Sequence, residues 1–273
     1  MWYNNSKHYS YTLHQERNYI MGKIIAFANQ KGGVGKTTSA VNIAASLGVL
    51  GYKVLMIDLD PQGNATSGVG IIKKSLKTTA FDLLTTDATV QDVMIKTRFD
   101  NLSIIPTNTT LARAEYELAD VENGEFVIKN KLAPVLDGFD YIIIDCPPSL
   151  SMLTVNAMVA SDGVIIPMQC EFYSLEGMSQ LMFTISRIKS HYNKELNVTG
   201  ILITMYNNRL ILSAQVLNEL RKHYADKLFE TTVSRNVKLS ESPSFGLPVY
   251  YHEKRSKGAV EYLNIAKELA ERI

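Results

Sequence analysis

Three glycines and two lysines are concentrated in the segment Lys31-Gly32-Gly33-Val34-Gly35-Lys36-Thr37-Thr38. An apolar run (residues 24–28) precedes this segment, and residues 39–47 after it have the apolar spacing of a helix. Strand, glycine-rich loop and helix in this order form the context of a phosphate-binding loop. Backbone N–H groups of such a loop turn inward around phosphate oxygens, and the helix N-terminus adds a partial positive charge. The segment therefore predicts a binding site for the phosphate chain of a nucleotide.

Side chains at the end of the loop can supply a mobile positive charge and a metal ligand. Lys36 can reach the β- and γ-phosphates, and the hydroxyl of Thr37 can ligate Mg²⁺. The usual G-x-x-x-x-G-K-[ST] pattern would place glycine at position 30, where this chain has Gln30. A second lysine, Lys31, stands at the start of the loop instead. One triphosphate has little need of two lysines from the same chain.

This arrangement resembles the deviant Walker A motif, KGGxGKT[ST], of the ParA/MinD family of ATPases. In that family the first lysine crosses a dimer interface to the nucleotide of the partner. The resemblance implies ATP and Mg²⁺ as cofactors, a homodimer with ATP sandwiched in it, and catalytic roles for Lys31 and Lys36. It also makes the whole loop nucleotide-binding, namely Lys31, Gly32, Gly33, Val34, Gly35, Lys36, Thr37 and Thr38.

Carboxylates follow two further apolar runs. Asp58 and Asp60 come after residues 54–57, and strand alternation would point both to the same side. Asp145 follows residues 141–144. An apolar strand that ends in aspartate is common, but the order of the three motifs matches Walker A, A′ and B of the family. The resemblance implies that Asp60 polarises the attacking water, that Asp145 holds a Mg²⁺-bound water, and that Asp58 supports either the Mg²⁺ shell or the loop.

Two later segments, residues 167–177 and 234–244, are similar to stretches of chromosomal ParA proteins of the Soj type. The resemblance thus covers residues 21–273. It implies that Arg235 and Asn236 contact the adenine, at a place where the family often has proline before the arginine and this chain has Ser234. Residues 1–20 are too few for the helix-turn-helix domain of long plasmid ParA proteins.

Length and composition suit one globular domain. The chain has 273 residues, of which 46% are hydrophobic, and a net charge of +1. We expect a single P-loop ATPase domain over residues 21–273 and a disordered or loosely docked leader over residues 1–20. The two cysteines, Cys146 and Cys170, argue against a disulfide framework and suit a reducing cytosol. No apolar run approaches the length of a membrane span, and the leader lacks a signal-peptide core.

Short apolar runs alternate with helical patterns along the chain. Strands are expected at residues 24–28, 54–57, 102–105, 141–144, 164–167 and 198–203. Helices are expected at residues 37–50, 111–119, 126–136, 150–160, 175–191, 211–224 and 258–273, with Gly51 capping the first. The pattern predicts an α/β fold with a doubly wound, mostly parallel sheet and helices on both faces, as in P-loop NTPases.

Positive charge is concentrated in the C-terminal part of the chain. Residues 80–140 carry 11 acidic and 5 basic side chains, whereas residues 200–257 carry 5 acidic and 9 basic ones. A dimer would carry two such patches, and affinity for DNA rises steeply with the number of phosphates contacted. Candidate DNA contacts are Arg209, Arg221 and Lys238, of which Arg209 and Lys238 match DNA-contacting positions of the Soj type. Lys222, Lys254 and Arg255 are weaker candidates, and a solvated surface role is equally compatible with each.

The favoured interpretation is a partition ATPase that hydrolyses ATP to ADP and phosphate and binds double-stranded DNA nonspecifically. We expect it in the cytoplasm at the nucleoid, stimulated by a ParB/Spo0J-like centromere-binding partner; chromosomal and plasmid cargo both remain open. A MinD-like positioning ATPase at a membrane is one alternative, against which the mixed charges of residues 258–273 speak. A small-molecule ATP-dependent ligase of the same superfamily is another, although no substrate pocket is recognisable.

Overall fold

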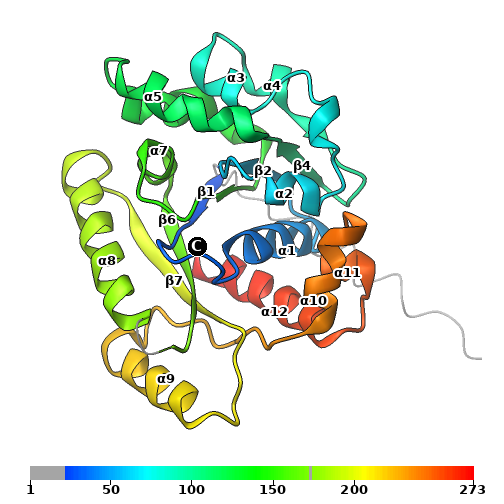
Figure 1. Ribbon diagram of the computed structural model, residues 1–273, viewed down its shortest axis with the longest axis vertical. Coiled ribbons are helices and arrows are strands. Elements are labelled where there is room, and N and C mark those ends of the chain that lie inside the picture. Colours follow the sequence, from blue (N-terminus) through cyan, green and yellow to red (C-terminus); the bar gives the residue numbers. More distant parts are fainter. Residues whose placement is uncertain (1–21, 172–173) are drawn as a thin grey trace, which may run out of the picture.

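A computed structural model of the chain describes residues 22–171 and 174–273. Seven strands of these residues form one sheet, and helices cover both of its faces (Figure 1). The strands are β1 (Lys23–Phe27), β2 (Val54–Asp58), β3 (Ile95–Lys96), β4 (Leu102–Ile105), β5 (Tyr141–Asp145), β6 (Gly163–Gln169) and β7 (Asn197–Thr204). The expected leader lies outside the described residues.

The strands lie in the order β3-β4-β2-β5-β1-β6-β7, and every neighbouring pair is parallel except β3 and β4. The prediction of a mostly parallel sheet is confirmed. The strand expected at 102–105 has the observed bounds, and the other five expected strands differ from the observed ones by one or two residues at their ends. The prediction missed β3, because a strand of two residues is too short to show a period. The carboxyl ends of the parallel strands meet at one edge of the sheet, where ligands bind in open α/β folds.

Twelve α-helices occur in the described residues. They are α1 (Lys36–Val49), α2 (Asn64–Gly68), α3 (Ala80–Thr85), α4 (Val90–Val93), α5 (Ala114–Ala119), α6 (Val127–Leu132), α7 (Met152–Ala160), α8 (Ser174–His191), α9 (Ile211–Tyr224), α10 (Val237–Glu241), α11 (Val249–His252) and α12 (Lys257–Arg272). The expected helix at 126–136 ends early as an α-helix and continues as 3₁₀ turns, because Pro134 cannot donate the next helical hydrogen bond. Likewise, the one expected at 111–119 begins as a 3₁₀ turn.

Residues along each central strand alternate between two separate cores. In β1, Ile24 and Ala26 belong to the core under α5 to α8, whereas Ile25 and Phe27 belong to the core under α1 and α12. Both cores exclude water, so the strands read as continuous apolar runs rather than as alternating ones. Burial on both faces is why the strands could be recognised in the sequence. It also fixes the pairing register of the strands, and hence the positions of the loops at their carboxyl ends.

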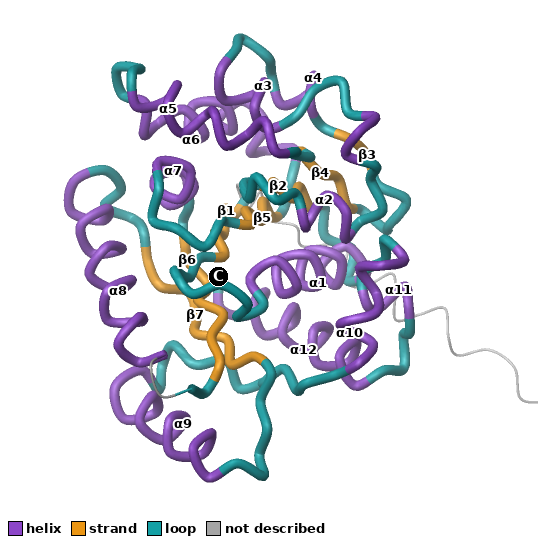
Figure 2. The backbone as a smooth tube through the Cα atoms, viewed as in Figure 1, coloured by secondary structure: helices purple, strands orange, loops and turns teal. Residues whose placement is uncertain are grey.

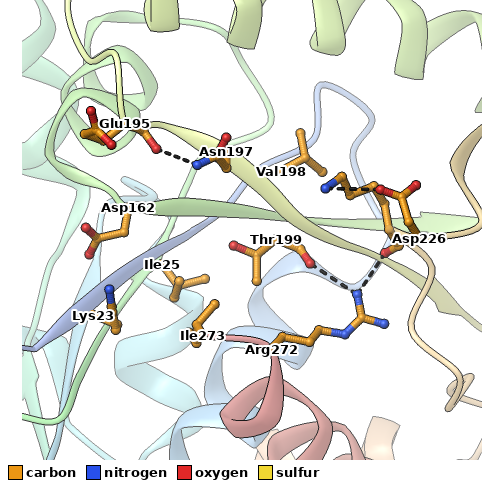
Figure 3. Close-up of a pocket in the computed structure, with 11 residues that line it drawn as sticks. Lys23, Ile25, Asp162, Glu195, Asn197, Val198, Thr199, Asp226, Arg272 and Ile273 are labelled. Carbon is orange, nitrogen blue, oxygen red and sulfur yellow. Dashed lines mark hydrogen bonds and ion pairs between the residues drawn. The ribbon is translucent and has the colours of Figure 1, made fainter. Parts of the chain in front are cut away.

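The C-terminal end of α12 is anchored to β7 and to the segment after α9. The guanidinium of Arg272 donates hydrogen bonds to the carbonyl oxygens of Thr199 and Lys227, at 3.2 and 3.3 Å (Figure 3). It also donates to the carbonyl oxygen of Leu228. These contacts border a cavity of about 480 Å³ at the start of β1, β6 and β7. That cavity lies at the opposite end of the strands from the glycine-rich loop. None of the described helices is both long and apolar enough to span a bilayer.

Two glycines allow α1 to end in close contact with the segment that precedes β4. Gly51 has a φ of 96°, and its expected role as the cap after this helix is confirmed. Gly48, one turn earlier, faces the backbone of Asp100, whose carbonyl oxygen lies 2.1 Å from where a Cβ on Gly48 would stand. A side chain at position 48 is therefore excluded unless the α1 and β4 segments move apart.

We expect Gly48→Ala to lower the free energy of unfolding by about 1 to 3 kcal/mol, because overpacking forces backbone shifts. Urea unfolding followed by circular dichroism measures the change. Gly177→Ala in α8 is the matched control, since nothing lies within 4 Å of its added methyl group. It should be neutral or stabilising by up to about 1 kcal/mol. Equal stability of Gly48→Ala and the unmodified chain would contradict the close approach.

Candidate nucleotide site

The glycine-rich loop lies between β1 and α1, at the carboxyl edge of the sheet. Gly33 and Gly35 have φ values of 73° and 86°, in the left-handed region that favours glycine. Gly35 directly precedes α1, so the loop delivers its N–H groups to the N-terminus of a 14-residue helix. Figure 2 shows the loops of this edge, in teal, beside the N-terminal end of α1. The backbone thus has the form that a phosphate cradle requires.

Polar side chains from the ends of β6 and β7 hold the loop from outside. Thr204 donates to the carbonyl oxygen of Val34 at 2.7 Å, and the amide of Gln169 donates to that of Gly33 at 2.8 Å. Asn29 accepts a hydrogen bond from the N–H of Lys31 at 3.0 Å. With these carbonyls occupied, the N–H groups after Lys31 remain as the face of the loop that can bind phosphate. Sequence reasoning missed these three residues, although a polar residue at the carboxyl end of a buried strand was a usable signal.

Lys36 lies beneath the loop and is almost fully buried, with 6% of its surface exposed. Its ammonium donates to the carbonyl oxygen of Lys31 at 3.1 Å. Burial lowers the pKa of Lys36, and the nearby carboxylates of Asp145 and Asp60 act against that shift. A cation held out of water gains strongly from an anionic ligand, so Lys36 is placed to bind phosphate oxygens.

Asp58 supports the loop that follows β2. Its carboxylate accepts hydrogen bonds from the N–H and hydroxyl of Thr66, at 2.7 and 2.6 Å, and from the N–H of Asp60 at 3.3 Å. Burial raises the pKa of Asp58 to about 6, against the effect of the Thr66 hydrogen bonds. Of the two roles expected for Asp58, these contacts fit support of the loop, and a place in the metal shell stays a prediction.

Asp60 follows at the beginning of a tight turn. One of its carboxylate oxygens accepts the N–H of Gln62 at 2.9 Å, and its carbonyl accepts the N–H of Gly63 at 2.7 Å. The side chain is mostly buried, with 8% exposed, and its charge acts on Lys36, Asp58 and Asp145. The three aspartates and the loop lysine expected from the sequence therefore lie together.

Asp145 at the end of β5 is fully buried, and neither of its carboxylate oxygens has a hydrogen-bond partner among the described residues. Burial and the charge of Asp58 raise its pKa well above the usual range, while the nearby Thr37 hydroxyl and Lys36 oppose the shift. A buried carboxylate without a partner is costly, and a hydrated cation would relieve it. No three His, Cys, Asp or Glu side chains of the described chain could hold a metal alone. The lone buried carboxylate of Asp145 suits a partly hydrated Mg²⁺, which keeps several waters and takes phosphate oxygens as ligands.

Lys31 is turned to a different partner from Lys36. Its ammonium forms an ion pair with Glu171, which lies two residues after β6, and the Lys31 side chain is 42% exposed. The two lysines of the loop thus separate: one is buried with the aspartates and the other is at the surface. A single chain holds its first lysine away from the buried aspartate cluster.

A cavity of about 540 Å³ opens next to the loop. Gly35 and Thr38 line one side of it, and Arg235 and Asn236 line another. The structure thus brings the residues expected at the adenine to the same cavity as the phosphate loop, and base binding itself stays a prediction. Ser234, which replaces the proline frequent in the family, donates its N–H and hydroxyl to Glu261, both at 3.1 Å. These two hydrogen bonds connect the wall of the cavity to α12.

The basic residues expected at DNA lie on three different elements. Arg209 precedes α9, Arg221 lies in its last turn, and both are exposed with no ion pair among the described residues. Lys238 of α10 is paired with Glu241 at 2.8 Å, which raises the pKa of the ammonium. Figure 1 shows α9 and α10 well apart, so one chain does not gather these charges into a compact patch.

A phosphate cradle on a helix N-terminus, a buried lysine and strand-end aspartates together define the class of P-loop nucleotide hydrolases. A family model described as an AAA domain matches residues 22–198. The sporulation initiation inhibitor protein Soj of Bacillus subtilis (strain 168) is 50% identical over 250 residues, which cover 92% of this chain and 99% of that protein. The chromosome partitioning protein ParA of Myxococcus xanthus (strain DK1622) is 46% identical, covering 92% and 89%.

The fold is shared with a solved structure that carries a nucleotide. The cobyrinic acid a,c-diamide synthase from Mycobacterium smegmatis, with a bound ATP analogue and magnesium, has a TM-score of 0.81 and 34% identity. The match covers 92% of this chain and 95% of that one. With half of its residues identical to Soj over nearly the full length of that protein, the chain belongs to the Soj/ParA family of chromosome-partitioning ATPases.

The unpartnered charge of Asp145 gives a pH-dependent prediction. Because its folded-state pKa is raised, its contribution to stability is complete at low pH and is lost as the pH rises through that pKa. Without nucleotide at pH 8, Asp145→Asn should therefore be more stable than the unmodified chain by about 1 to 3 kcal/mol. The difference should shrink toward pH 4, as urea unfolding at several pH values would show.

Binding of a nucleotide with Mg²⁺ should stabilise the unmodified chain more than Asp145→Asn. A nonhydrolysable ATP analogue with Mg²⁺ should raise the melting temperature of the unmodified chain more than that of Asp145→Asn. Asp137→Asn, a change at an exposed carboxylate, is the control and should follow the unmodified chain throughout. If Asp145→Asn is the less stable protein at pH 8 without Mg²⁺, the carboxylate has a partner that this account lacks.

Proposed function

We propose that this chain is an ATP-timed dimerisation switch that binds duplex DNA without sequence preference and partitions it. The observation that carries the proposal is the separation of the two loop lysines in a member of the Soj/ParA family. Lys36 is buried among the aspartates, and Lys31 is at the surface on Glu171. A second subunit that faces the loop would offer Lys31 a triphosphate, and the γ-phosphate would then hold the two subunits together.

The chain's own residues provide most of a hydrolytic site. The loop N–H groups and Lys36 would bind and neutralise the phosphate chain, and Asp60 would polarise the attacking water. Thr37 would hold Mg²⁺ directly and Asp145 would hold it through water. Bound there, the metal would neutralise charge on the β- and γ-phosphates. Lys31 of the opposite subunit would complete charge neutralisation, so hydrolysis would be slow in a monomer.

The ion pair of Lys31 with Glu171 is weak enough to be exchanged. Both side chains are about half exposed, and exposed pairs contribute about 0 to 1 kcal/mol. An ammonium shared with a triphosphate in a water-poor interface gains more than this. Glu171 therefore keeps Lys31 ordered in the monomer without preventing its transfer in the dimer.

Dimerisation would also gate DNA binding. One monomer presents Arg209, Arg221 and Lys238 on separate elements, and Lys238 is neutralised by Glu241. Two monomers on one rigid body double the number of phosphates contacted, and the binding constant rises steeply with that number. Release after hydrolysis would follow when the two copies separate. A ParB/Spo0J-like protein bound at the centromere would stimulate hydrolysis, and nucleoid DNA would be the matrix.

The main competing function is ATP-dependent activation of a small molecule. Similarity to a diamide synthase structure raises this possibility at 34% identity. Identity of 50% with Soj over nearly its whole length favours partition. Turnover that requires a small carboxylate or amine, and that DNA does not affect, would favour the ligase. A MinD-like membrane role would instead appear as co-sedimentation with liposomes, which α12 does not favour because its outer face carries both signs of charge.

Lys31→Ala should leave ATP binding to the monomer nearly unchanged and abolish both ATP-induced dimerisation and ATP-dependent DNA binding. Light scattering and fluorescence anisotropy with a duplex, each with and without ATP, measure the two effects. Asp60→Ala should instead accumulate ATP-bound dimers that bind DNA and hydrolyse ATP only at a low residual rate. A Lys31→Ala protein that dimerises and hydrolyses at the normal rate would exclude the exchange between subunits.

Substitutions of Lys238 and of its partner Glu241 should change DNA affinity in opposite directions. Lys238→Ala should weaken ATP-dependent binding and reduce the slope of log K against log salt by about one for each phosphate that the ammonium neutralises. Glu241→Gln should strengthen binding, because it frees the ammonium that Glu241 neutralises. Lys129→Ala in α6, an exposed lysine on the acidic part of the chain, is the control. Equal salt slopes in all four proteins would remove Lys238 from the interface.

A further inference from the structure

A lysine that the mechanism does not use lies against the loop that carries Asp60. Lys73 begins the 3₁₀ turn Lys73–Ser75, which follows α2. Its ammonium donates to the carbonyl oxygen of Gln62 at 2.7 Å. The contact closes the chain between residues 62 and 73 into a ring, with α2 inside it. Lys73 is half-buried, whereas the side chain of the next residue, Lys74, is exposed and forms no hydrogen bond or ion pair among the described residues.

Gln62 connects this lysine with the catalytic carboxylate. The N–H of Gln62 donates to Asp60 at 2.9 Å, while its carbonyl accepts from Lys73. The carbonyl that Lys73 holds and the N–H that orients Asp60 are therefore joined through a single Cα atom, that of Gln62. The stem of Lys73 also packs on Gly63, where its Cδ lies 2.7 Å from the place of a Cβ. Gly63 has a φ of 62°, so position 63 is restricted by both backbone and contact.

We propose that Lys73 is a positioning residue for ATP hydrolysis, which acts by holding Gln62 so that its N–H fixes the carboxylate of Asp60. The inference rests on the proposed role of Asp60 toward the attacking water. A hydrogen bond from an ammonium to a carbonyl is about twice as strong as a neutral one, so the turn is clamped on its solvent side. On its inner side, Asp58 is already bound to Thr66 and to the N–H of Asp60.

The two clamps restrict different parts of the turn. Asp58 holds the backbone at Asp60 from the buried side, and Lys73 holds Gln62 from the exposed side. Removal of the outer clamp leaves the sheet, the phosphate loop and Lys36 untouched. Asp60 would keep its place in sequence but sample more orientations, and a displacement of about 1 Å can cost a large factor in rate. The effect should fall on the chemical step and not on nucleotide binding.

The test compares Lys73→Met, Lys73→Arg and Lys74→Met in steady-state ATP hydrolysis with Mg²⁺ and saturating duplex DNA. Lys73→Met should lower kcat about tenfold, with KM for ATP and melting temperature within error of the unmodified chain. Lys73→Arg keeps a donor for Gln62 and should recover most of the rate. Lys74→Met should be indistinguishable from the unmodified chain, because Lys74 has no such contact.

Combination with Asp60→Ala separates positioning from a general loss of structure. If Lys73 acts through Asp60, Lys73→Met should cause no further decrease in rate in the Asp60→Ala background. Normal kcat for Lys73→Met, an arginine variant as slow as the methionine variant, or additive effects in the double variant would each overturn the inference. Failure of the proposed function has a different signature, since the unmodified chain would then not hydrolyse ATP or Asp60→Ala would hydrolyse it normally.

Discussion

Negative charge held out of water at the carboxyl edge of the sheet is the constraint on which the site depends. Asp58 and Asp145 are completely buried, Asp60 nearly so, and one buried ammonium, that of Lys36, accompanies them. Asp58 is compensated by hydrogen bonds, whereas Asp145 lacks partners among the described residues. The cluster is therefore completed best by a ligand that brings both a cation and an anion, which describes a nucleotide with its metal. Until such a ligand binds, the uncompensated carboxylate lowers the free energy of unfolding.

The rest of the edge divides into parts that stay fixed and parts that can change partner. Thr204 and Gln169 bind loop carbonyls and hold the cradle in one shape. The ion pairs of Lys31 with Glu171 and of Lys238 with Glu241 are exposed on both sides. Exposed pairs cost little to break. The bonds that can be exchanged thus lie where a second subunit or a polyanion can compete, and the bonds that shape the cradle lie behind them.

Much of this could be predicted from the sequence because its strongest signals are local. Glycines at 33 and 35 adopt the left-handed backbone that such a loop requires, and the doubly buried strands read as continuous apolar runs. Asp58, Asp60 and Asp145 meet because parallel strands end at one edge. The sequence could not give the partner of Lys31, since Glu171 is 140 residues away and its pairing depends on the path of the chain after β6.

Other features were hidden because no period or spacing marks them. The helices α2, α10 and α11 have four or five residues, too few for an apolar face to repeat. The clamp of Lys73 on Gln62 depends on the fold of the short segment between them, so the lysine reads as a surface charge in the sequence. The break after α6 was also missed, since the helix expected at 126–136 runs through it, but Pro134 was a signal that could have predicted it.

The anchoring of the last helix has a practical consequence for work with fusion proteins. Arg272, the penultimate residue, is bound to three carbonyl oxygens near β7 and to Glu268. In the same helix, the hydroxyl of Tyr262 lies 3.0 Å from that of Ser39, two residues beyond Thr37 in α1. A fluorescent tag joined directly after Ile273 would strain α12, which contacts the helix that follows the candidate phosphate loop. A flexible spacer between Ile273 and the tag would leave this contact undisturbed.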